Sequence, residues 1–173
     1  MLVELDDTRL TRLSEPDVAA ALNAVGVVVP DPASADLDEL AADFHAAFLQ
    51  PTGGGAPPVA SLWTEGRFEG NAAARLRELA KSAAVDFDSE EARGAPIDHV
   101  GSMLHLWAAT HERATWVADE LASVHLAAVA PALTQAVSAE GFYGSVAQAV
   151  LELNAVLEQH GSKRERDDPQ VGQ

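Results

Sequence analysis

The chain has 173 residues, of which 47% are hydrophobic and none is cysteine, and its formal net charge at pH 7 is −16. A domain of this length buries roughly 70% of its unfolded surface, so one core can stabilise it without disulfides. The lack of cysteine excludes thiol catalysis, iron–sulfur clusters and cysteine-based zinc sites. The acidic charge argues against a nucleic-acid interface, which needs Lys and Arg gathered on one face. It suits a cationic protein partner or solubility in a salt-rich cytoplasm, and both interpretations stay open.

The first residues and the apolar runs bear on location. Met1 is followed by LVELDDTRL, which has neither the basic start nor the apolar stretch of a secretory signal peptide. No apolar run reaches the length that a transmembrane helix needs. We therefore expect a soluble protein that remains in the cytoplasm.

The first part of the chain predicts two helices. Ser14 is a candidate N-cap with Pro16 in the first turn, and the apolar residues that follow share one face as far as Val25. After the break at PDPAS, Asp36 is a candidate cap for a second helix, which Pro51 ends. The apolar stripe of this helix comprises Leu37, Leu40, Ala41, Phe44 and Phe48.

The stretch PTGGGAPP, residues 51–58, predicts a loop that connects this helix to the next. Pro58 suits the first turn of a short helix through Trp63, and the apolar spacing of residues 71–84 predicts a longer one. Residues 86–96 then return to loop.

The C-terminal half predicts three further helical segments, about residues 97–110, 115–138 and 142–159. Pro131 lies inside the second and is expected to kink it near Val129. We find no strand alternation and no repeat, so the predicted fold class is all-α, a single compact helical bundle of irregular topology. Its domain is expected over residues 1–160, with a charged, disordered tail over 161–173.

Asp98 and His99 follow Pro96, which places an acid and an imidazole in the first turn of a helix. Catalysis needs a third group within hydrogen-bond reach, and Ser102 is the only local nucleophile. Side chains on one helical turn diverge, so a hydrolytic triad is not expected. An acid there also stabilises the helix N-terminus. We predict no catalytic residue and no enzymatic activity.

Metal and cofactor patterns are weak. His99, His105 and His111 recur every six residues, but six residues turn a helix by about 600°, so successive imidazoles lie about 240° apart. The run Gly53–Gly55 lacks the Lys and Ser or Thr of a phosphate loop. We predict neither a metal nor a cofactor. The histidines interpreted as surface or satisfied side chains are His45, His125 and His160.

Two tryptophans differ in their surroundings. Trp107 lies in a helix that is apolar nearly all round, which predicts a core position. Trp63 ends the short helix beside the glycine loop, where core packing and an exposed anchor for a ligand chain are both open.

Four segments, in this order, resemble the motifs of one family. FHAAFLQPTGGGAPPVASLW is similar to a helix, a Gly/Pro loop and a PP..S.Y/W element, and GAPIDHVGSMLHLWAAT is similar to a P.DH...EL.F signature. DELASVHLAAVAPAL resembles an FL..HL..W helix, and GFYGSVAQAVLELNAVL resembles a closing FY..LA..LL.F helix. The family is that of the TorD/DmsD/NarJ chaperones for molybdoenzyme maturation.

This resemblance implies a chaperone that binds the twin-arginine signal peptide, or the apo-form, of a molybdenum-containing oxidoreductase until its cofactor is inserted and before export. A receptor for guanidinium groups followed by an apolar stretch needs carboxylates beside an apolar groove. The peptide-binding residues mapped by motif are Pro57, Pro58, Ser61 and Trp63 for the apolar wall, and Asp98 and His99 for the polar rim.

The alternative is a NarJ-like assembly adaptor, which binds an internal segment of a cytoplasmic or membrane-anchored reductase subunit. In both interpretations the partner is a protein, without nucleic acid or stable membrane association. A monomer and a domain-swapped dimer both stay open.

Overall fold

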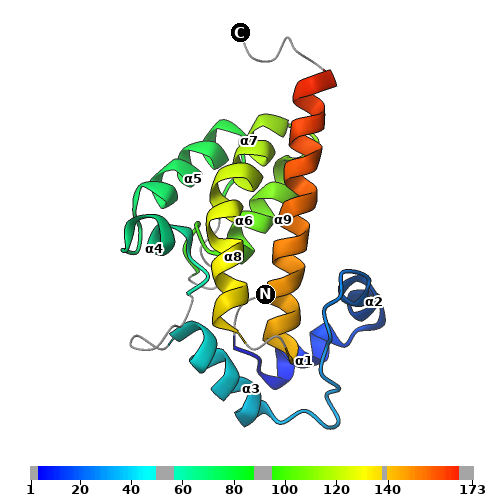
Figure 1. Cartoon of the computed structure of the whole chain (residues 1–173). Coiled ribbons are helices and arrows are strands. Elements are labelled where there is room, and N and C mark those ends of the chain that lie inside the picture. Colours follow the sequence, from blue (N-terminus) through cyan, green and yellow to red (C-terminus); the bar gives the residue numbers. More distant parts are fainter. Residues whose placement is uncertain (1–3, 50–56, 88–94, 138–139, 168–173) are drawn as a thin grey trace. The chain divides into compact units, whose positions relative to one another are not determined.

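The computed structural model describes residues 4–49, 57–87, 95–137 and 140–167, and over these ranges the chain is helical without a β-strand (Figure 1). The all-α prediction is confirmed. Extended pairing within these ranges is limited to an isolated antiparallel bridge between Val59 and His99. The chain groups into two compact units, so the single domain stays a prediction. Unit 1 holds Met1–Pro58 and Pro131–Leu151, and unit 2 holds Val59–Ala130 and Glu152–Gln173.

Short helices with polar caps open unit 1. The Asp6 carboxylate accepts the N–H of Arg9 at 2.7 Å and caps a first helix that the sequence pattern did not predict. Ser14 follows the end of this helix and donates its hydroxyl to the carbonyl of Leu10, so its prediction as an N-cap is wrong. Asp36 is confirmed as a cap, because its carboxylate accepts two N–H groups of the next first turn. These helices are α1 (Asp7–Leu13), α2 (Pro16–Ala24), α3 (Leu37–Phe44) and the π-helical segment η1 (His45–Leu49).

An aromatic cluster forms the core of unit 1. Phe48 is fully buried, and its ring centroid lies 5.3 Å from that of Phe44 and 5.7 Å from that of Tyr143. Phe142 meets Tyr143 edge-on, with centroids 5.0 Å apart. The Tyr143 hydroxyl accepts the backbone N–H of Leu5 at 3.2 Å, which ties the segment before α1 to the cluster.

Unit 2 packs short and medium helices around aliphatic side chains. The segment α4 contacts α5, and α6 contacts both α7 and η2. The fully buried side chains of this core include Leu76, Leu79, Ile97, Met103, Leu121 and Leu126. The helices are α4 (Ala60–Glu65), α5 (Asn71–Ser82), α6 (Val100–Thr110), α7 (Thr115–Glu120) and the π-helical segment η2 (Leu121–Leu126).

The helical run that begins with α7 changes geometry before its proline. After η2 it continues as α8 (Ala127–Ala136), which contains Pro131. Proline clashes with the carbonyl four residues earlier, and the wide π-helical turn ends directly before that carbonyl. A kink or break was predicted near Val129; this residue lies in α-helix, and the π-helical turns end three residues before it, at Leu126.

The last helix is α9 (Phe142–Asp167), which follows Gly141 at a φ of 91°. Its end was predicted near Gln159, which is eight residues too early. Four of the eight added residues are Lys, Arg or Glu, which have good helix propensity and extend an existing helix without a new nucleation step. Part of the predicted disordered tail is therefore helical, and residues 168–173 lie outside the described residues.

Candidate functional site

The two motif elements of the predicted site meet in unit 2. Val59, directly before α4, forms its backbone bridge with His99, and the N–H of Ala60 donates to the carbonyl of Asp98 at 2.9 Å. The structure therefore brings Ser61 next to Asp98, 37 residues away in sequence. Of the two prolines mapped to the site, Pro57 is half-buried and Pro58 is buried, and both belong to unit 1.

Asp98 holds the start of α4. Its carboxylate oxygen Oδ2 accepts the backbone N–H of Ser61 at 3.0 Å and also the Ser61 hydroxyl. Both side chains are 0% exposed, so Asp98 satisfies orphan donors of a helix N-terminus from a distant part of the chain. Asp98 was predicted for the polar rim of a peptide site, and in the structure its carboxylate is buried and faces these donors inside unit 2. Its other oxygen, Oδ1, has no hydrogen-bond partner within the described part of the chain.

His99 is the N-cap of α6. Its Nδ1 accepts the N–H of Gly101 at 3.0 Å, and the ring is largely buried. An accepting Nδ1 assigns the proton of the neutral ring to Nε2. Because α6 begins at Val100, Asp98 and His99 precede the first turn in which they were predicted. Asp98 and His99 thus connect the starts of α4 and α6.

Exposed aromatic side chains lie on and beyond α4. Trp63 is 41% exposed, and Phe68 is 62% exposed after the turn at Gly66. Of the two interpretations left open for Trp63, core packing is wrong. Glu65 accepts the N–H of Ala72 at 3.0 Å, and the backbone amides at the start of α5 lower the pKa of this carboxyl. The short link between α4 and α5 is therefore fixed at both ends.

The position of Trp107 differs from its prediction. Its ring is half-buried rather than enclosed in the core, and it stacks on His111 with ring centroids 4.8 Å apart and an interplanar angle of 15°.

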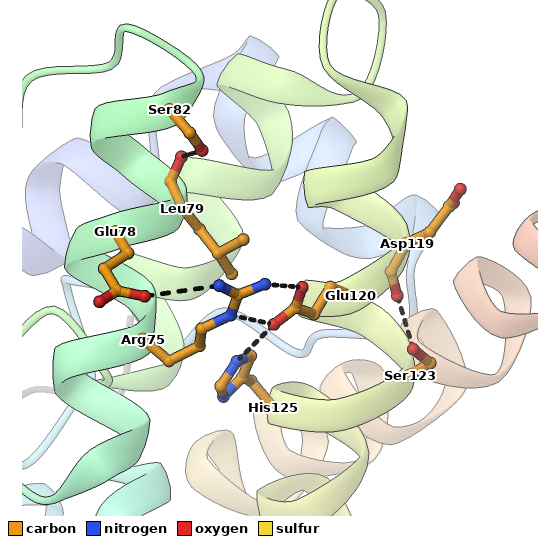
Figure 2. A network of polar contacts seen from close by, with 8 residues as sticks. All are labelled: Arg75, Glu78, Leu79, Ser82, Asp119, Glu120, Ser123 and His125. Atoms are coloured by element: carbon orange, nitrogen blue, oxygen red, sulfur yellow. Dashed lines mark hydrogen bonds and ion pairs between the residues drawn. The ribbon is translucent and has the colours of Figure 1, made fainter. Parts of the chain in front are cut away.

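A charged network connects α5 to the junction of α7 with η2 (Figure 2). Arg75 binds Glu120 in a bidentate pair, with Nε 2.6 Å from Oε1 and Nη2 2.7 Å from Oε2. The hydrogen bond from Arg75 lowers the pKa of Glu120, and the same bond raises the pKa of Arg75. This ion pair connects two helices of unit 2.

His125 was interpreted as a surface or satisfied histidine, and this is wrong. The side chain is buried, its Nε2 makes no hydrogen bond within the described residues, and burial lowers its pKa. The signal was present in the sequence, because His125 lies four residues after Leu121 and four before Val129, on an apolar helix face.

Further features limit the chemistry that unit 2 offers. A cavity of about 340 Å³ is lined by Arg77, Lys81, Phe87 and Ile97 among others, and none of the six residues mapped as peptide-binding contributes to it. Among the described residues, no three His, Asp or Glu side chains are placed to hold a metal ion. Within the same ranges, no helix has the length and apolarity to cross a membrane.

Comparisons with known proteins identify the family. Residues 12–140 match the family model of the nitrate reductase delta subunit, and this range contains the first three of the four motif segments. A search of curated proteins finds no match. Because the family match covers well over half of the chain, the chain belongs to the nitrate reductase delta subunit family, a family of chaperones for molybdoenzyme maturation.

Proposed function

We propose that this chain is a cytoplasmic chaperone that binds the twin-arginine signal peptide, or the apo-form, of a molybdenum-containing oxidoreductase before its export. In this proposal it performs no catalysis. The main support for the proposed site is the exposure of Trp63. This large aromatic side chain is 41% exposed, and it lies on a helix whose start is bound to Asp98.

The support for α4 favours binding because it keeps the aromatic side chain in place. Ser61, Asp98 and His99 are buried and hydrogen-bonded, so they act on a peptide by holding α4 and α6. A surface that is ordered before binding loses less conformational entropy when a partner arrives. In the proposed site Trp63 contacts the apolar part of the peptide, and Pro57 and Pro58 remain candidate wall residues.

The charge of the chain favours a cationic partner. A formal net charge of −16 attracts a segment with two arginines over long range and accelerates the encounter at low salt. The attraction is screened at high salt, where the Debye length falls to about 3 Å at 1 M, so the apolar contact then supplies most of the affinity. A direct ion pair between an arginine and Asp98 requires the carboxylate to become accessible, and Oδ1 is the oxygen available for it.

Titration calorimetry with a synthetic peptide tests the site. The probe carries two consecutive arginines followed by an apolar stretch, and a second peptide carries lysines at both positions. Trp63→Ala is expected to weaken binding of the first peptide by about tenfold or more, as loss of an aromatic anchor costs at least about 1.4 kcal/mol. Trp116→Ala is the matched control, because Trp116 is 49% exposed in the same unit and belongs to none of the motif positions. Equal affinity of Trp63→Ala and the parent chain would contradict the site.

The NarJ-like adaptor is the second candidate, and the family description favours it because it refers to a nitrate reductase. Co-purification with a client reductase whose signal peptide has been deleted distinguishes the two proposals. Binding that persists supports recognition of an internal segment, and binding that disappears supports recognition of the signal peptide.

A further inference from the structure

The Glu120 carboxylate lies between the guanidinium of Arg75 and the imidazole of His125, and both approach the same oxygen. Its Oε1 accepts the hydrogen bond from Arg75 Nε at 2.6 Å, and the Nε2 atom of His125 lies 3.9 Å from the same Oε1 (Figure 2). The second distance is too long for a hydrogen bond. In the structure as described, Arg75 is therefore the partner of this oxygen and His125 is a close neighbour.

One ring nitrogen of His125 is buried without a hydrogen-bond partner among the described residues. The residue is 5% exposed, and Nε2 has no hydrogen-bond partner within the described residues. A buried polar nitrogen without a partner destabilises the fold, and Glu120 lies close enough for a small movement to pair the two. Protonation makes such a movement more favourable, because an imidazolium donates from both ring nitrogens and needs a negative charge nearby.

The charged groups that act on His125 come from three parts of unit 2. Glu120 and Asp98 raise its pKa, Arg75 lowers it, and burial, the largest effect, lowers it further. The net direction is down, so the ring is neutral at neutral pH.

We propose that Arg75 and His125 are alternative hydrogen-bond donors to Oε1 of Glu120. When His125 takes up a proton, Oε1 exchanges its hydrogen bond from Arg75 for one from the imidazolium. With His125 neutral, Arg75 holds both carboxylate oxygens and connects α5 to α7. With His125 protonated, its Nε2–H donates to Oε1 and Arg75 keeps Oε2 alone. No covalent bond changes, and the proton comes from solvent.

The direction of this switch follows from the lowered pKa. A histidine that is harder to protonate in the folded state contributes stability that is present above its ordinary pKa, near 6.5. That stability is lost as the pH falls from there through the folded-state pKa. The bidentate pair between Arg75 and Glu120 is therefore complete at neutral pH and loses its Oε1 hydrogen bond on acidification. The inference is independent of the proposed function, since it uses no peptide.

Nuclear magnetic resonance on the whole chain tests the switch directly. We expect the His125 ring to titrate with a midpoint below about 6.5, and the Nε resonance of Arg75 to shift with the same midpoint. An Arg75 resonance that passes through the His125 titration unchanged would overturn the proposal. A His125 midpoint at or above the ordinary value would overturn it as well.

Charge variants give a second readout with opposite signs. Arg75→Gln removes a repelling charge and frees Glu120, so the His125 midpoint is expected to rise. Glu120→Gln removes the attracting carboxylate, so the midpoint is expected to fall. Arg77→Gln is the control, because Arg77 lies on the same helix and pairs with Glu69 at 3.4 Å. The same direction of shift in both variants would refute the exchange of partners, and the titration of the parent chain decides the matter if a variant does not fold.

Discussion

Replacing Asp98 tests how far a buried carboxylate supports α4. Asp98→Ala leaves the N–H and the hydroxyl of Ser61 without an acceptor in a fully buried position. Each unsatisfied group lowers the free energy of unfolding by about 1–3 kcal/mol. The substitution also removes Oδ1, which has no partner among the described residues, and this offsets part of the cost. We therefore expect the free energy of unfolding to fall by roughly 2–4 kcal/mol. Asp98→Asn keeps an acceptor of the same shape and is expected to lose less.

Urea unfolding followed by circular dichroism at neutral pH measures this loss. The parent chain, Asp98→Ala and Asp98→Asn are compared with the same dependence of the unfolding free energy on urea concentration. Asp36→Ala is the matched control, because Asp36 also accepts two N–H groups at a helix start but is exposed to solvent. Loss of such an exposed cap costs about 1 kcal/mol. If Asp98→Ala destabilised the chain no more than Asp36→Ala, the reasoning from burial would be refuted.

Two further predictions concern the aromatic cluster of unit 1. Burial raises the pKa of Tyr143 to about 12, so stability conferred by this group is present below the ordinary value near 10 and is lost as the pH rises toward 12. Tyr143 is the only tyrosine of the chain, so tyrosinate absorbance reports it alone, and a native midpoint equal to that in urea would contradict its burial. Phe48→Ala is expected to cost about 3–5 kcal/mol in urea unfolding, whereas Leu49→Ala, at an exposed neighbour, costs less than about 0.5 kcal/mol. Similar losses for the two variants would mean that Phe48 is not a core residue.

The helices were the most predictable part of the structure because their causes are local. The stripe after Asp36 and its cap depend on residues three or four positions apart, and both appear as predicted over α3 and η1. The errors occur where one residue type serves two local purposes. Ser14 can cap a following helix or bond back to the preceding turn, and in the folded chain it bonds back to Leu10.

The all-α class, most helix positions, the family motifs and the acidic charge follow from the sequence alone, because these depend on composition and short-range spacing. The surroundings of Asp98 and His125 follow only from the folded chain. Asp98 was predicted to form the polar rim, and in the structure its buried carboxylate binds Ser61 at the start of α4, which lies 37 residues away in the sequence. The Nε2 atom of His125 has no hydrogen-bond partner among the described residues, because packing places the ring beside Glu120 while Arg75 already holds that carboxylate. Burial and partner choice arise from contacts between distant segments, and these set the hydrogen bonding and protonation that a local pattern does not encode.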